Sequence, residues 1–114
     1  MSGITTHVLD TARGRPAAGV PVTLDRREPD GRWTRVGAGT TDADGRLRTL
    51  VPDPAALAAG VYRITFDTAE YFSANEVEGF YPEASVVFTV RNPAEHFHVP
   101  LLLNPFGYST YRGS

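Results

Sequence analysis

Apolar and polar residues alternate with a period of two through much of this chain, in short segments separated by turn residues. In the clearest example Tyr62, Ile64 and Phe66 alternate with polar residues, and the segments 20–24 and 97–101 repeat the pattern. Successive side chains of a β-strand point to opposite faces, so this spacing is typical of half-buried strands and does not fit a helix. The chain is therefore expected to fold mainly from short β-strands.

Glycine and proline mark where these strands end. The segment 10–19 contains two glycines and a proline and is predicted to be a loop, while Pro29-Asp30-Gly31 predicts a turn that returns into a strand over 33–39. A second turn is expected at residues 42–45 (DADG), followed by a short strand over 46–50.

Two segments favour short helices. Residues 53–60 begin with an aspartate and a proline and end in glycine, which predicts a single helical turn. Residues 68–77 predict one short helix, capped by Asp67 or Thr68 and presenting Tyr71, Phe72 and Val77 on one side.

Together these elements predict a mainly β fold, a Greek-key β-sandwich of seven to eight strands with one short helix. The 114 residues are expected to form a single domain over 1–114, which is long enough to bury about two-thirds of its unfolded surface. The absence of cysteine excludes disulfides and thiolate chemistry.

The charge and hydropathy of the chain limit the classes of binding partner that are expected. The net charge is −2 and the arginines are scattered among acidic residues, so no nucleic acid partner is expected. The N-terminus lacks the basic and apolar regions of a secretory leader, and no apolar run approaches membrane-spanning length. We therefore expect a protein without a membrane partner, located in the cytoplasm.

The three histidines are the first candidates for chemistry. If Phe97, Val99 and Leu101 fill the core, His96 and His98 project from the opposite face of their strand. His7 shares a strand face with Thr5, so it would lie on the same outer surface as His98 if the two strands belong to one sheet. Such a surface could be ordinary polar surface, a subunit interface or a site with tuned imidazoles.

Other constellations are weaker. The DADG segment resembles the start of a calcium loop, but its later ligands are missing, so a hairpin turn is the favoured interpretation. Three histidines without cysteine or a paired carboxylate give little support to a metal site. Ser109 and Ser114 lack the context of a nucleophilic serine. Arg46 and Arg48 alternate on one strand face, which suits either recognition of a planar anion or a solvated surface.

Five segments carry a resemblance that covers nearly the whole chain: residues 4–11 (ITTHVLDT), 41–46 (TDADGR), 80–82 (FYP), 97–103 (FHVPLLL) and 108–114 (YSTYRGS). The chain resembles the 5-hydroxyisourate hydrolases, the transthyretin-related enzymes of urate degradation. The terminal Tyr-Arg-Gly-Ser distinguishes these hydrolases from transthyretin proper, the hormone carrier. The middle of the chain alone would also suit a prealbumin-like adhesion or regulatory module.

The resemblance implies a transthyretin/prealbumin-like sandwich assembled as a homotetramer, a dimer of dimers, with active sites in clefts at the subunit interface. It implies a purine-derived small-molecule substrate and neither a cofactor nor a metal. Carried over position by position, it assigns the catalytic residues to His7, Arg46, His98 and Ser114, and substrate binding to Tyr111, Arg112 and Gly113.

The chemistry that follows is the opening of a purine-derived ring by water. A near-neutral imidazole can remove the proton of the attacking water. Either His7 or His98 serves as this base while the other holds or polarises the system, and the sequence leaves the two assignments open. Arg46, with Ser114 or backbone donors, would hold the heterocycle and the developing oxyanion. A ligand carrier and a non-catalytic interaction module are the alternatives.

Overall fold

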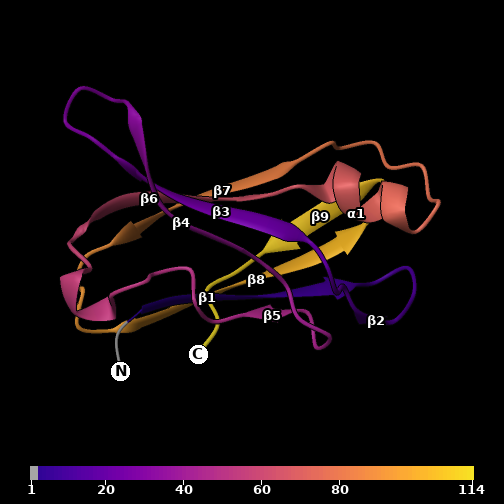
Figure 1. The fold of residues 1–114 in the computed structure, drawn as a ribbon, viewed down its shortest axis with the longest axis horizontal. Coiled ribbons are helices and arrows are strands. Elements are labelled where there is room, and N and C mark those ends of the chain that lie inside the picture. Colours follow the sequence, from indigo (N-terminus) through magenta and orange to yellow (C-terminus); the bar gives the residue numbers. More distant parts are fainter. Residues whose placement is uncertain (1–2) are drawn as a thin grey trace.

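The computed structural model describes residues 3–114, which form two facing β-sheets (Figure 1). Residues 1–2 belong to the N-terminal segment that was predicted to lack the features of a secretory leader, and they lie outside the described residues. The elements are β1 (Gly3–Asp10), β2 (Arg15–Pro16), β3 (Pro21–Arg27), β4 (Trp33–Thr40), β5 (Arg46–Leu47), the 3-10 helix η1 (Pro54–Ala56), β6 (Gly60–Phe66), α1 (Thr68–Ala74), β7 (Ala84–Val90), β8 (His96–Asn104) and β9 (Gly107–Thr110).

The first sheet has the order β2-β1-β8-β9, with β5 also paired to β1, and the second has the order β4-β3-β6-β7. The pairings between these strands are antiparallel except that of β1 with β8, which is parallel along the whole length of β1. The predicted mainly β sandwich is confirmed. The parallel pair brings the first and the penultimate strand side by side, so both ends of the chain contribute to one sheet surface.

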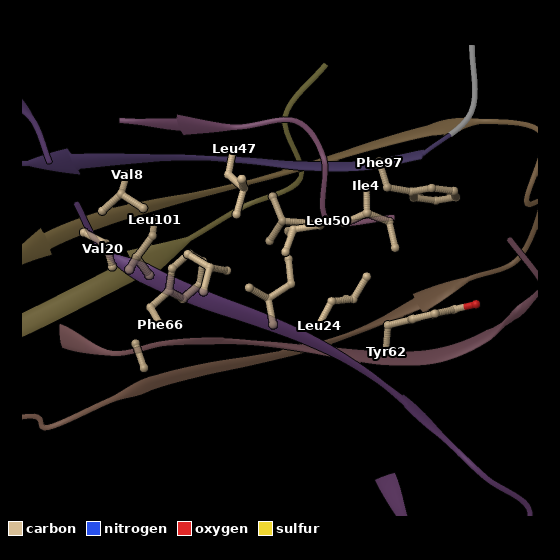
Figure 2. Close-up of a cluster of buried hydrophobic side chains, with 14 of the residues drawn as sticks. Ile4, Val8, Val20, Leu24, Leu47, Leu50, Tyr62, Phe66, Phe97 and Leu101 are labelled. Carbon is tan, nitrogen blue, oxygen red and sulfur yellow. The ribbon is translucent and has the colours of Figure 1, made fainter. Parts of the chain in front are cut away.

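The core lies between the sheets and follows the predicted alternation (Figure 2). Tyr62, Ile64 and Phe66 are at most 1% exposed, and Ile4 and Leu101 meet them from the other sheet with the same degree of burial. Most of the inward residues are apolar, so the polar residues of the strands lie mainly on the outward faces.

The short helix is confirmed, but it ends earlier than predicted. Asp67 caps its start by accepting a hydrogen bond from the Glu70 amide (3.1 Å). The helix stops at Ala74 because Glu76 adopts a left-handed conformation (φ 56°), and the Val77 amide turns back to the Phe72 carbonyl (2.9 Å). Val77 is consequently 37% exposed. No helix in residues 3–114 is long and apolar enough to cross a membrane.

The segment after the DADG turn also differs from the prediction. Its strand covers only Arg46–Leu47, because the chain then bends inward to bury Leu50, whose carbonyl lies against the backbone of Gly37. The turn itself is present, yet it is not a hairpin between paired strands, since β4 and β5 belong to different sheets. It instead carries the chain from one sheet to the other.

Candidate active site

The parallel pairing of β1 and β8 creates the surface on which the imidazoles lie. Thr5 is the register partner of His98, and His7 is the partner of Pro100, two residues further along. Phe97 and Val99 point into the core, so His96 and His98 project from the outer face, as predicted. His7 and His98 therefore share one face of one sheet.

Strand β5 extends this surface on the other side of β1. Arg46 is directly opposite His7 in the antiparallel register, so their side chains lie on the same face. The preceding turn fixes this position, because the Asp42 carboxylate accepts hydrogen bonds from the amides of Asp44 (2.9 Å) and Arg46 (3.0 Å). The bond from the Arg46 amide is the main cause that lowers the pKa of Asp42.

The end of the chain folds back onto the same surface, where the last residues run past β1 and β5 (Figure 1). The Gly113 amide donates a hydrogen bond to the carbonyl of His98 (2.8 Å), which makes an isolated bridge to β8. A Cβ atom at Gly113 would lie 2.6 Å from Cδ2 of His98, so only glycine fits against the ring without a shift.

A pocket of about 570 Å³ opens on this surface. It is lined by Gly3, Ile4, Thr5, Thr6, Arg46, Arg48, Val51, Pro54, His96, His98 and Ser114. Three of the four predicted catalytic residues, Arg46, His98 and Ser114, thus border one cavity. His7 lies beside it, on the sheet face next to Arg46. Arg48 lines it as well, although it lies beyond the end of β5.

Hydrogen bonds distinguish the imidazoles. Nε2 of His7 lies 2.9 Å from the carbonyl oxygen of Asp44, which can only accept, so this nitrogen carries a proton. Nδ1 of His98 lies 2.8 Å from the hydroxyl of Thr5. No hydrogen bond to Nε2 of His98 is found within residues 3–114. His98 therefore has a ring nitrogen available to a substrate or a water.

The electrostatics favour a neutral imidazole at His98. Partial burial is the largest cause that lowers its pKa, and the positive charges of His7, His96 and Arg46 act in the same direction. A neutral imidazole at physiological pH is the form that can accept a proton.

The terminal motif is divided between two surfaces. Gly113 and Ser114 lie against the His98 pocket, whereas Tyr111 and Arg112 line a second groove of about 240 Å³ beside β7. The Arg112 guanidinium sits 4.7 Å from the centre of the Phe97 ring and 3.4 Å from the Glu95 carboxylate. These two residues do not reach the pocket within their own chain.

Sequence reasoning missed one contributor and left two others without a role. The Thr5 hydroxyl contacts two imidazoles, those of His96 and His98. Strand alternation placed Thr5 on the same face as His7 but did not indicate these contacts. His96 and Arg48 line the pocket, but no motif assigned them a function. Among residues 3–114, no group of three His, Cys, Asp or Glu side chains is positioned to hold a metal ion.

Comparison with known proteins agrees with this arrangement. A 5-hydroxyisourate hydrolase of Salmonella dublin is 47% identical over 111 residues, which cover 97% of this chain and 80% of that protein. The structure of Klebsiella pneumoniae 5-hydroxyisourate hydrolase superimposes with a TM-score of 0.86 at 38% identity, with complete coverage of both chains.

Transthyretin from Sparus aurata superimposes with a TM-score of 0.92 at 33% identity, covering 99% of this chain and 97% of that one. The model of the HIUase/Transthyretin family matches residues 4–113. These matches span the whole sandwich together with the surface that carries His7, Arg46 and His98. The chain therefore belongs to the HIUase/transthyretin family.

Proposed function

We propose that this protein hydrolyses 5-hydroxyisourate to 2-oxo-4-hydroxy-4-carboxy-5-ureidoimidazoline, a step of urate degradation. The observation that carries the proposal is a pocket in which a half-buried imidazole with a lowered pKa and an unbonded Nε2, that of His98, lies beside the guanidinium of Arg46. The hydrolase relatives supply the substrate, and the pocket supplies chemistry that suits it.

His98 is the general base in this proposal. As water attacks the ring carbonyl carbon, Nε2 takes up one of its protons while the new C–O bond forms. The ring C–N bond then breaks, and the imidazolium returns the proton to the leaving nitrogen. His7 is the weaker candidate for the base, because it lies beside the pocket and does not line it. In this proposal His7 instead helps to hold or polarise the reacting groups next to Arg46.

Arg46 and Ser114 complete the site. A guanidinium presents several donors in one plane, which matches a planar heterocycle and can stabilise an oxyanion that develops on it. Ser114 lines the same pocket and can offer its hydroxyl there. Holding substrate and base together in this way converts a slow reaction with water into one between positioned groups.

We further propose a homotetramer, a dimer of dimers, located in the cytoplasm. Tyr111 and Arg112 lie outside the His98 pocket of their own chain, so a role for them in substrate binding needs a site completed by a second copy. Light scattering measures the assembly directly. A stable monomer with full activity would contradict both the tetramer and the interfacial site.

A spectrophotometric assay tests the activity. Uricase acting on urate generates 5-hydroxyisourate, whose absorbance decays slowly alone and is expected to decay much faster with this protein. Folded protein that leaves the decay unchanged would contradict the enzymatic function and favour a ligand carrier of the transthyretin kind. A binding measurement with aromatic ligands would then follow.

A further inference from the structure

One hydroxyl lies between two imidazoles at the edge of the pocket. Oγ1 of Thr5 is 2.8 Å from Nδ1 of His98 and 2.9 Å from Nε2 of His96. A hydroxyl has one proton to donate and two lone pairs that accept. Thr5 can therefore donate to only one of the two rings, and the other ring must donate to Thr5 for both bonds to form.

Two arrangements satisfy both contacts. In the first, Thr5 donates to Nδ1 of His98, whose neutral ring then carries its proton on Nε2 and has no lone pair for water. In the second, Nδ1–H of His98 donates to Thr5, and Thr5 donates to Nε2 of His96. Only the second arrangement leaves a lone pair on the unbonded Nε2 of His98.

The second arrangement also fits the state that follows proton uptake. An imidazolium has a proton on each ring nitrogen, so Nδ1 of His98 must be a donor once Nε2 has accepted a proton. Starting from the second arrangement, no hydroxyl has to rotate during the reaction. Starting from the first, the Thr5 proton would face the Nδ1 proton and the contact would be lost.

The geometry points to Thr5 as a positioning residue that holds His98 in its Nδ1–H tautomer, with His96 accepting a hydrogen bond from the Thr5 hydroxyl. This inference rests on the proposed function, because it explains how the base of that reaction is kept ready. It also gives a role to His96, which the family resemblance left without one. Thr5 itself does not exchange a proton with the substrate.

The surroundings of the pair hold the contact between Thr5 and His98 in place. Gly113 packs directly against the His98 ring, and its amide bonds to the His98 backbone carbonyl, so the ring has little freedom to turn away from Thr5. Thr5 and His98 are also register partners on adjacent parallel strands, which fixes the distance between their Cβ atoms. The tautomer is thus the main variable that the hydroxyl can control.

Two Thr5 variants and a matched control test the role of the hydroxyl. Thr5→Val removes the hydroxyl but keeps a β-branched shape that suits a strand, and Thr5→Ser restores the hydroxyl. Thr11→Val is the control, since the Thr11 hydroxyl also bonds across to β8, at the Leu103 carbonyl (3.2 Å), away from the imidazoles. All three side chains are small, so the sandwich core remains intact.

The first measurement is the tautomer itself, read from long-range ¹H–¹⁵N NMR correlations at about pH 8, where an ordinary imidazole is neutral. We expect the Nδ1–H form of His98 in the wild type, in Thr5→Ser and in Thr11→Val, and a loss of that form in Thr5→Val. His96→Leu, with Thr5 intact, should move the population toward Nε2–H. A wild-type His98 in the Nε2–H form overturns the inference, as does a tautomer that neither Thr5→Val nor His96→Leu changes.

The second measurement is turnover of 5-hydroxyisourate. Thr5→Val should lower kcat by about 10-fold or more, but by less than the loss of the general base itself, which contributes about 10²–10⁴-fold. KM should change little, because the hydroxyl acts on the base and not on substrate binding. Thr5→Ser should recover most of the kcat, and an equally low kcat for both variants would contradict the role of the hydroxyl.

The two measurements also separate this inference from the proposed function. The NMR experiment contains no substrate, so its result stands whether or not the protein hydrolyses 5-hydroxyisourate. A wild type without hydrolase activity but with the expected tautomers would refute the function alone. An active wild type with an Nε2–H tautomer at His98 would refute the inference alone.

Discussion

The backbone of Gly113 packs against the imidazole of His98 so closely that an added Cβ atom would lie 2.6 Å from Cδ2 of the ring. A glycine near the end of the chain therefore forms a wall for a side chain of β8. The hydrogen bond from the Gly113 amide to the His98 carbonyl holds this wall in place (2.8 Å).

Gly113→Ala should accordingly push the His98 ring out of position and lower kcat, because small displacements of a positioned group slow catalysis strongly. The fold should persist, since the core does not include Gly113. Gly107→Ala is the matched control, because a Cβ there meets its nearest atom at 3.8 Å. Full hydrolase activity in Gly113→Ala would show that the ring tolerates the methyl group.

His98→Asn and His7→Asn should each lower kcat, the former by about 10²–10⁴-fold as expected for loss of a general base. Both side chains lie outside the core, so circular dichroism and the melting temperature should stay near those of the wild type. A folded, fully active His98→Asn would remove the role of base from His98. A folded, fully active His7→Asn would show that His7 is not needed to hold or polarise the reacting groups.

The acidic limb of kcat/KM should have its midpoint below the ordinary histidine pKa of about 6.5. Burial, followed by the charges of His7, His96 and Arg46, lowers the pKa of His98, so the base stays neutral to a lower pH and activity is lost only beneath it. Arg48 and Ser114 also line the pocket, so the pH dependence of kcat/KM should be measured on a protein in which both residues are unchanged.

NMR titration of His98 gives the same quantity without substrate. Arg46→Gln should raise the pKa of His98 slightly, since one positive neighbour is removed while burial, the larger cause, remains. A midpoint above that of an ordinary histidine would contradict a neutral base at His98.

Arg46 and Arg48 both line the pocket, yet they should not be equivalent. Arg46 is fixed in β5 opposite His7, whereas Arg48 lies beyond the strand. Arg46→Gln should reduce kcat/KM by about 10²-fold or more, the usual effect of losing an oxyanion donor, and Arg48→Gln should reduce it less. Equal losses in steady-state assays would assign the substrate contact to both side chains.

Phe66→Ala should destabilise the fold by about 3–5 kcal/mol, because this fully buried ring would leave a cavity between the sheets (Figure 2). Phe106→Ala, at a residue that is 70% exposed, should change the stability by less than about 0.5 kcal/mol. Urea denaturation at one protein concentration compares the two, since the stability of an oligomer depends on concentration. Similar midpoints for the two variants would contradict the assigned core.

The sequence by itself determined the class of fold and the faces of the strands. Alternation is a local property, so Tyr62, Ile64 and Phe66 could be assigned to the core and His98 to the outer face without knowing which strands pair. The same alternation identified the histidines and Arg46 as candidates, and the resemblance, which also depends on the sequence alone, assigned their roles. The end of α1 was harder to predict, because a glutamate, Glu76, takes the left-handed conformation that usually falls to glycine.

Only the tertiary structure decided how these residues meet. The parallel register of β1 with β8 joins segments more than ninety residues apart, and no local pattern specifies it. This register brings Thr5 to His98, whereas the pairing of β5 with β1 brings Arg46 to His7. Long-range contacts also divide the terminal motif: Gly113 packs against the His98 ring, whereas the Arg112 guanidinium lies over Phe97. The two residues face different surfaces because successive positions of an extended chain point to opposite sides.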